Sequence, residues 1–353
     1  MRDIDVERSI SGDRVDYLVF DETDAADIPD EVWRSCDAIL VWHRMHIPAS
    51  VVAKLDRCRL IIRVGVGFDI VDVAACRRRG IPVSNVPNYG TTEVADHALA
   101  LLLHLVRGLG AYEARLKADL VNGFVAENIP VVRRIRGATF GAIGMGRIGT
   151  AIARRAAGFD MKVIYFDPFL TEGHELGLGL ERMKTMDVLL ERSDVVSLHV
   201  PLSEATRNLM GAVQFSRMRP GSIFINVARG GLVDLEALRD ALESGHLDAA
   251  GLDVLPNEPP VPTPRLIQEW AANAPWLAGR LVVTPHSAFY SEAGYHDMRV
   301  FSAEILMDYL FGCSLRNNVN AGWQNNVPPQ AHAGTPVLAG PDGPTTATQQ
   351  DRV

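Results

Sequence analysis

The sequence predicts an α/β fold in which two domains are each built around a doubly wound parallel sheet. The chain has 353 residues, 47% of them hydrophobic, which is enough to form two substantial cores. Short apolar runs rich in β-branched residues alternate with segments of helical periodicity, and this alternation occurs in two separate stretches. Strands that alternate with helices favour a parallel sheet covered on both faces.

The first stretch predicts the smaller, flavodoxin-like domain. We expect helices at 51–55 and 71–80, and strands at 16–20, 38–42, 60–65 and 81–86. A long helical segment follows at 91–120 and is interrupted around Gly108 and Gly110. Its apolar residues occupy nearly the whole circumference, so it requires burial on more than one side. A connection between domains or a subunit interface would supply that burial.

The second stretch predicts the larger domain, with strands at 138–144, 162–167, 194–200, 222–228, 249–254 and 280–285. Helices are expected between several of these strands, including 147–159 and 235–245. A last helix at 290–311 is expected to return to the first domain. The predicted domains are therefore 1–107 together with 290–320, and 108–289. Residues 321–353 hold five prolines and four glycines without periodicity, which predicts a disordered tail.

Composition excludes several classes of function. The net charge of −8 provides no basic excess for binding nucleic acid. The first ten residues lack the apolar core of a signal peptide, and the longest apolar run is too short to span a membrane. The four cysteines are scattered without a CxxC pair, so neither a disulfide framework nor a zinc site is expected. These features predict a cytoplasmic protein.

A glycine-rich loop predicts a dinucleotide site. Gly144, Gly146 and Gly149 form a GxGxxG pattern that follows a predicted strand and opens a predicted helix. Gly144 permits the tight turn, Gly146 admits a pyrophosphate, and Gly149 allows the helix to pack on the strand. Asp167 ends the next strand, where a carboxylate accepts hydrogen bonds from ribose hydroxyls and repels a 2′-phosphate. The pattern is typical of a Rossmann domain and favours NAD over NADP.

Three chemically active side chains each follow a strand of the larger sheet. Arg229, Glu258 and His286 are all expected at the edge beyond the carboxyl ends of the strands, where doubly wound sheets bind ligands. Histidine can carry a proton near neutral pH, glutamate can stabilise its charged form, and arginine can bind a carboxylate. Taken singly, each is compatible with a surface ion pair or a structural role. Gly230 and Gly231 are interpreted as clearance for a ligand beside Arg229.

The chain resembles the D-isomer-specific 2-hydroxyacid dehydrogenase family over residues 15–320, through "RVGVGFDIVD", "TTEVADHALALLL", "GAIGMGRIG", "NVARGGLVD", "LDVLPNEP" and "TPHSA". Within that family it is most similar to the C-terminal-binding-protein branch, through "TPHSAFYSEAG" and "LRNNVN". The resemblance implies that Arg229, Glu258 and His286 are catalytic, with His286 as proton donor and acceptor. It also implies a homodimer joined through the cofactor domains.

The resemblance further implies two sets of ligand contacts. Substrate contacts are expected at Arg63, Gly65, Val66, Gly67 and Phe289, with the loop N–H groups on the substrate carboxylate. Cofactor contacts are expected at Val94, Ile143, Gly144, Met145, Gly146, Arg147, Ile148, Asp167, Val200, Pro201, Thr206, Val227, Ala228 and Asp253. Val66 and Phe289 differ from the small polar residue and the tryptophan of the corepressor relatives.

The sequence therefore predicts an NAD-dependent dehydrogenase of small 2-hydroxy or 2-keto acids. The alternative is an NAD(H)-sensing corepressor-like scaffold that keeps the same residues as a ligand site. Two further pairs have open interpretations. His43 and His46 are candidates either for the wall of the substrate cleft or for a metal, and Asp69 and Asp72 are interpreted as turn and helix-cap residues. Phe289 and Trp42 favour a partly apolar pocket, and the identity of the acid is not determined.

Overall fold

The computed structural model describes residues 3–320, and the predicted tail at 321–353 lies outside the described residues. The larger of two sheets has seven parallel strands in the order β10-β9-β8-β7-β4-β5-β6. They are β4 (Thr139–Ile143), β5 (Lys162–Phe166), β6 (Glu181–Arg182), β7 (Val195–Leu198), β8 (Ser222–Asn226), β9 (Leu247–Leu252) and β10 (Leu281–Val283). The chain builds outward from β4 in one direction and then returns to build outward from β7 in the other. The topological switch point therefore lies between β4 and β7.

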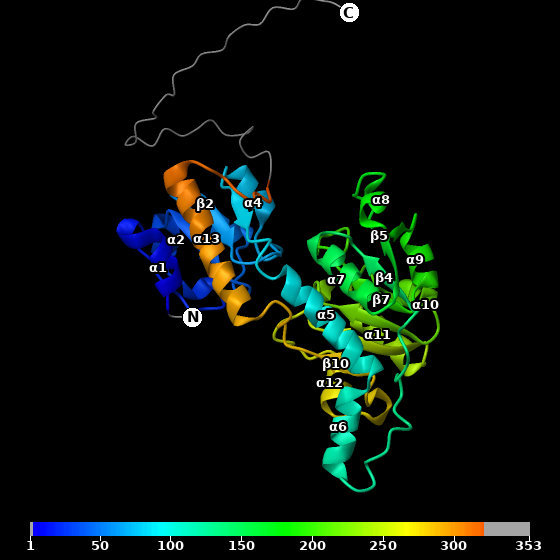
Figure 1. Ribbon diagram of the computed structural model, residues 1–353. Helices are drawn as coiled ribbons and strands as arrows, with labels where there is room; N and C mark the ends of the chain where they lie inside the picture. The colour runs from blue at the N-terminus through cyan, green and yellow to red at the C-terminus, as the bar shows by residue number, and fades with distance from the viewer. Residues whose placement is uncertain (1–2, 321–353) are drawn as a thin grey trace, which may run out of the picture.

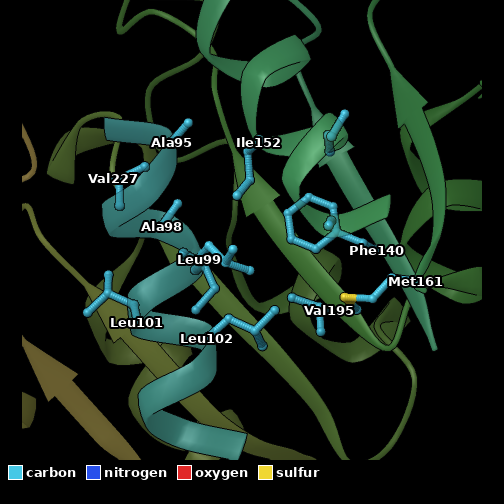
Figure 2. Packing of buried hydrophobic residues seen from close by; sticks show 14 of the residues in the cluster. Ala95, Ala98, Leu99, Leu101, Leu102, Phe140, Ile152, Met161, Val195 and Val227 are labelled. Carbon is cyan, nitrogen blue, oxygen red and sulfur yellow. The ribbon is translucent and has the colours of Figure 1, made fainter. Parts of the chain in front are cut away.

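Helices cover both faces of this sheet, as the sequence predicted. One face carries α5 (Thr91–Val106) and α7 (Arg147–Gly158), and the other carries α9 (Met186–Arg192), α10 (Ala212–Arg217) and α11 (Leu235–Glu243). Successive residues of β4 face opposite sides, so Ala142 packs with the first group of helices and Ile143 with the second. Figure 2 shows the first core, where side chains of α5 and α7 meet Phe140.

The smaller sheet has three parallel strands, β1 (Ala38–Val41), β2 (Leu60–Arg63) and β3 (Val83–Asn85), in that order. The strand expected at 16–20 is absent, and that prediction was wrong. The segment does not join the sheet: Tyr17 packs against the smaller core, whereas Leu18 is 70% exposed. A short continuous apolar run predicted a strand, but such a run alone does not supply a neighbouring strand to pair with.

Short helices surround the smaller sheet, and others connect the strands of the larger sheet. Around the smaller sheet lie α1 (Asp5–Ser11), η1 (Gly12–Arg14), η2 (Ala25–Asp27), α2 (Asp30–Ser35), α3 (Ala49–Val52) and α4 (Val73–Arg78). The larger unit adds α8 (His174–Leu178), η3 (Gly230–Leu232), α12 (Arg265–Ala271) and η4 (Pro275–Leu277).

Two long helices connect the units. The last helix, α13 (Glu292–Gly312), packs against α1 and β2 of the smaller unit, where its Arg299 is buried against Glu7. In contrast, α5 packs along α7 and against β8 and β9, so its core belongs to the larger unit. The expected domain boundary at residue 107 disagrees with this packing, and we propose instead that the boundary falls just before Thr91.

Beyond α5 the chain bends and projects from the body as α6 (Leu109–Ala118) (Figure 1). The expected interruption around Gly108 is confirmed, because Gly108 takes a left-handed conformation at the start of α6. Within residues 3–320 no individual helix has the length and apolarity needed to cross a membrane. Helices α5 and α6 meet those two criteria only when they are counted as one segment, and they are bent by 52° relative to each other.

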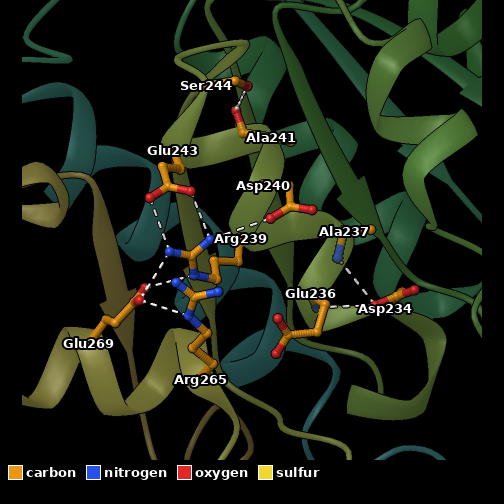
Figure 3. Close-up of polar contacts among 10 residues, drawn as sticks. All are labelled: Asp234, Glu236, Ala237, Arg239, Asp240, Ala241, Glu243, Ser244, Arg265 and Glu269. Carbon is orange, nitrogen blue, oxygen red and sulfur yellow. Dashed lines mark hydrogen bonds and ion pairs between the residues drawn. The ribbon is translucent and has the colours of Figure 1, made fainter.

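The stretch between Glu258 and His286 contains α12 and η4 before it reaches β10. A buried arginine of α11 holds these two short helices in place. The Arg239 guanidinium is 3% exposed and forms paired ion contacts with Glu243 and Glu269, at 2.8 to 3.0 Å (Figure 3). Its charge also lies 5.6 Å from the ring centre of Trp276 in η4. These contacts fix the far end of the segment that begins with the predicted catalytic glutamate.

Candidate active site

A cleft of about 340 Å³ lies between the two units, beyond the carboxyl ends of the larger sheet's central strands. Most of the predicted site residues line it: Arg63, Val66, Gly67, Val94, Gly146, Arg147, Ile148, Val200, Pro201, Val227, Ala228, Arg229, Asp253, His286 and Phe289. The others lie outside its lining: Gly65, Ile143, Gly144, Met145, Asp167, Thr206 and Glu258. The Thr206 hydroxyl is engaged within its own turn, with Pro201 and Ser203.

The glycine loop has the geometry of a phosphate cradle. Gly144 has a φ of 91°, and a Cβ there would lie 2.6 Å from the His199 carbonyl oxygen. A Cβ at Gly149 would overlap the Gly144 carbonyl, so helix α7 can approach β4 only with glycine at that position. A Cβ at Gly146 would meet no atom within 4 Å, which leaves open space in front of the first N–H groups of α7. The structure therefore gives Gly144 and Gly149 the steric roles predicted for them, and it leaves open space at Gly146.

Asp167 closes the cradle at the end of β5. Its carboxylate accepts hydrogen bonds from the N–H groups of Met145, at 2.9 Å, and Phe169, at 3.0 Å. The nearby Arg182 donates to the carbonyl oxygens of Asp167, Leu170 and Thr171. Its guanidinium is thus committed to the backbone rather than presented to a ligand. A carboxylate whose neighbouring Arg182 is bound to backbone carbonyls suits the ribose of NAD and disfavours a 2′-phosphate.

His286 and Glu258 form a close pair at the edge of the cleft. The distance from His286 Nδ1 to Glu258 Oε2 is 2.5 Å, and the Leu255 N–H donates to the other carboxylate oxygen at 2.9 Å. Burial raises the pKa of Glu258, but the hydrogen bond and charge of His286 outweigh it and lower this pKa below its usual range. A carboxylate only accepts, so Nδ1 carries the proton and Nε2 is left to exchange one with a substrate.

Arg229 is oriented by a carboxylate from the other unit. Its Nε donates to Asp69 Oδ1 at 2.9 Å, and its Nη1 donates to the Ala228 carbonyl at 2.8 Å. Asp69 was expected to be a turn residue, and that interpretation missed this contact. Asp72 is confirmed as the cap of α4, where it accepts from the Ala75 N–H at 2.8 Å. The contact between Asp69 and Arg229 joins residues 160 positions apart, and no local sequence pattern predicts it.

A second arginine is buried in the same cleft. Arg63 is 6% exposed, and its Nη1 donates to the Val64 carbonyl. Burial and the charge of Arg229 lower the pKa of Arg63 to about 10. The loop glycines make room for both guanidinium groups, because a Cβ at Gly65 would overlap Arg63 and a Cβ at Gly67 would overlap Arg229. The glycines predicted for substrate contact therefore also leave space for the two guanidinium groups in their present positions.

Gly230 and Gly231 do not provide clearance for a ligand, so that interpretation was wrong. A Cβ at Gly230 would overlap the backbone at Leu255, and one at Gly231 would lie 3.0 Å from the Leu202 side chain. At Gly230 the backbone packs closely against the loop at Leu255, and the Leu255 N–H donates a hydrogen bond to Glu258. Gly230 thus allows the arginine and glutamate segments to lie side by side.

An aromatic wall faces His286. The ring of Phe289 lies 6.2 Å from His286, 6.3 Å from His43 and 6.2 Å from Tyr89, measured between ring centres. His43 lies in the cleft, as one of its two interpretations required. Burial, with the charges of His286 and Arg63, lowers the pKa of His43 to about 4, so its ring is neutral near pH 7.

Comparison with known proteins agrees with this geometry. Residues 99–288 match the family described as "D-isomer specific 2-hydroxyacid dehydrogenase, NAD binding domain". The chain is 32% identical over 314 residues to C-terminal-binding protein 1 of Caenorhabditis elegans, covering 86% of this chain and 41% of that protein. It is 34% identical over 284 residues to D-3-phosphoglycerate dehydrogenase of Archaeoglobus fulgidus, covering 80% and 51%. The chain thus spans about half the length of these relatives, or less.

Solved structures give the same result. D-lactate dehydrogenase from Aquifex aeolicus, complexed with NAD and lactic acid, has 28% identity and a TM-score of 0.73, covering 82% of this chain and 87% of that one. A glyoxylate/hydroxypyruvate reductase from Sinorhizobium meliloti, in complex with NADP and malonate, has 30% identity and a TM-score of 0.75, covering 85% and 88%. The cradle, the acidic residue at its end and these matches show that the protein belongs to the NAD-binding D-isomer-specific 2-hydroxyacid dehydrogenase family.

Proposed function

We propose that the protein is an NAD-dependent dehydrogenase that interconverts a small 2-keto acid and the corresponding D-2-hydroxy acid. The observation that carries this proposal is the placement of two chemically complementary groups in one cleft. The His286–Glu258 pair can transfer a proton, and Arg229 can bind a carboxylate. Both lie at the edge of the sheet whose glycine loop suits NAD.

The protein's side chains would have separate tasks in the reduction. The bound nicotinamide supplies or accepts the hydride, with the overall balance 2-keto acid + NADH + H⁺ → 2-hydroxy acid + NAD⁺. His286 Nε2 donates the proton to the former keto oxygen, and Glu258 stabilises the imidazolium before that transfer. Arg229 binds the carboxylate, while Asp69 holds its Nε and leaves Nη2 directed at the loop around Gly67.

The cleft favours a small acid with a modest apolar group. Phe289, Tyr89 and neutral His43 form one wall, and the loop bearing Val66 forms another. The related structures named above were solved with lactic acid and with malonate. These observations support short keto acids such as pyruvate, glyoxylate and hydroxypyruvate as the first substrates to test.

The test is NADH oxidation against a panel of keto acids that runs from glyoxylate to branched and aromatic acids. Wild-type protein should turn over at least one of them, and NADPH should be a poorer donor. His286→Ala should lose this turnover, whereas His174→Ala, at the start of α8, should keep it. Equal rates for wild type and His286→Ala on every acid would refute the proposed activity.

The similarity to C-terminal-binding protein 1 favours a second candidate, an NAD(H)-responsive scaffold. In that case the same site would report cofactor state to a partner protein. Affinity capture with and without NADH, using the His286→Ala variant, separates the two functions. A partner retained by the inactive variant only when NADH is present would support the scaffold.

We also propose that the protein forms a homodimer through the projecting arm, meaning α6 and residues 119–132. Several large apolar side chains of this arm are exposed, including Leu120 at 76%, Val121 at 83% and Phe124 at 83%. Such a group of exposed apolar side chains is typical of a subunit contact. Light scattering should give a dimer for wild type and a monomer for Val121→Asp/Phe124→Asp; a wild-type monomer would refute this.

A further inference from the structure

A chain of three polar side chains lies behind the catalytic histidine. His97 of α5 places its Nε2 2.9 Å from the Thr284 hydroxyl, just after β10. That hydroxyl donates to Asp253 Oδ1 at 2.6 Å, just after β9. His97 and Thr284 are partly buried, and Asp253 is 1% exposed. His97 and Thr284 have no role in the chemistry described so far.

The last member of this chain, Asp253, holds the loop that carries His286. Its carboxylate accepts hydrogen bonds from the Ser287 N–H at 2.9 Å and the Ala288 N–H at 3.0 Å. Its carbonyl oxygen accepts from the His286 N–H at 2.7 Å. His286 itself has a φ of 53°, a left-handed conformation that a residue with a side chain adopts only under constraint. Asp253 supplies that constraint, because its carboxylate binds Thr284 before His286 and Ser287 and Ala288 after it.

The direction of the hydrogen bonds is fixed along the chain. An ionised carboxylate can only accept, so the Thr284 hydroxyl proton points at Asp253. The Thr284 oxygen must then accept from His97, which places a proton on His97 Nε2. Each donor thus orients the next group, and α5 is linked by its side chain to the loop from Thr284 to Phe289.

We propose that His97 and Thr284 are positioning residues that act on His286 through Asp253. This inference rests on the proposed dehydrogenase function, because it assigns the two residues to the orientation of its proton donor. Loss of the Thr284 hydroxyl removes one of three donors to the Asp253 carboxylate. The carboxylate can then rotate, and the Ser287 and Ala288 N–H groups lose their fixed acceptor.

Kinetics on the full chain provide the first test. Thr284→Val and His97→Leu should lower kcat by roughly 10- to 100-fold, since displacement of a catalytic group by about 1 Å has costs of that order. KM for the keto acid should change by less than about threefold, because neither residue is among those that line the cleft. Thr284→Ser and His97→Gln keep a donor and should recover most of the activity. His104→Leu, two turns along the same helix, is the matched control and should leave kcat unchanged.

Hydrogen exchange provides a second readout that does not depend on turnover. The amide groups in a peptide spanning 284–290 should exchange faster in Thr284→Val and His97→Leu than in wild type, whereas peptides from β4 and α7 should not. Unchanged kcat and unchanged exchange in both variants would overturn the inference while leaving the proposed function intact. If wild type proves inactive on every acid, the proposed function fails, and faster exchange confined to this loop would still support the positioning role.

Discussion

Replacement of Glu258 by glutamine tests the proton-transfer pair most specifically. The substitution keeps the shape of the side chain and removes its charge, so the imidazolium of His286 loses its neighbouring anion. The low pKa of Glu258 means that this anion is present from acidic pH upward. The reduction reaction needs the imidazolium as proton donor. The variant should therefore reduce the keto acid with a lower kcat than wild type.

The size of the effect follows from the geometry. Two charges separated by ~4 Å attract by about 4 kcal/mol at an effective dielectric constant of ~20. His286 and Glu258 side chains are 24% and 34% exposed, so solvent screens part of this attraction. Hydrogen bonds to charged groups contribute about 1.5–3 kcal/mol net. Because ~1.4 kcal/mol corresponds to about tenfold in rate, kcat should fall by roughly 10- to 100-fold.

The assay is the initial rate of NADH oxidation from about pH 5 to pH 9, with the best keto acid of the panel. Glu181→Gln is the matched control, because Glu181 pairs with Arg192 away from the cleft. The control profile should coincide with that of wild type. A kcat in Glu258→Gln equal to that of wild type across this pH range would show that Glu258 does not stabilise the proton donor.

Three further changes test the cofactor and substrate ends of the cleft. Asp167→Ser should raise the Kd for NADH and reduce the preference over NADPH by about tenfold or more, measured by fluorescence titration; an unchanged preference would remove Asp167 from cofactor selection. Asp69→Asn should raise KM for the keto acid through a loosened Arg229 while Kd for NADH stays constant. Asp72→Asn keeps the capping oxygen of α4, so it should leave KM unchanged and alter stability in urea titration by less than about 0.5 kcal/mol. Gly67→Ala should displace the Arg229 guanidinium and raise KM for the keto acid at least tenfold (~), and a wild-type KM would contradict the crowding at this position.

Much of the fold followed from the sequence because its signals are local. The GxGxxG pattern, the strand before it and Asp167 after the next strand occupy one short stretch, so the cofactor cradle could be predicted with its individual glycine roles. Arg229 and His286 could be placed in the cleft because each follows a buried strand of one parallel sheet. The pairing of Glu258 with His286 followed from the same argument together with the complementary chemistry.

Features that depend on long-range packing could not be predicted. Asp69 reaches Arg229 across the cleft, and only the folded arrangement of the two units brings them together. Gly230 was assigned to a ligand because its true neighbour, the backbone at Leu255, is distant in sequence. The side of the boundary to which α5 belongs depends on which sheet buries it, and its nearly all-round apolar surface was compatible with either.

The central claim is that His286 transfers a proton to a keto oxygen while Arg229 holds the carboxylate beside NADH. The most direct measurement is single-turnover reduction of the best keto acid by enzyme-bound NADH, in wild type and in His286→Gln. Chiral separation of the product follows in the same experiment. Wild type should give a D-2-hydroxy acid, and the single-turnover rate should be lower by roughly 100-fold or more in the variant. Equal rates in the two proteins, or an L-hydroxy acid as the product, would contradict it.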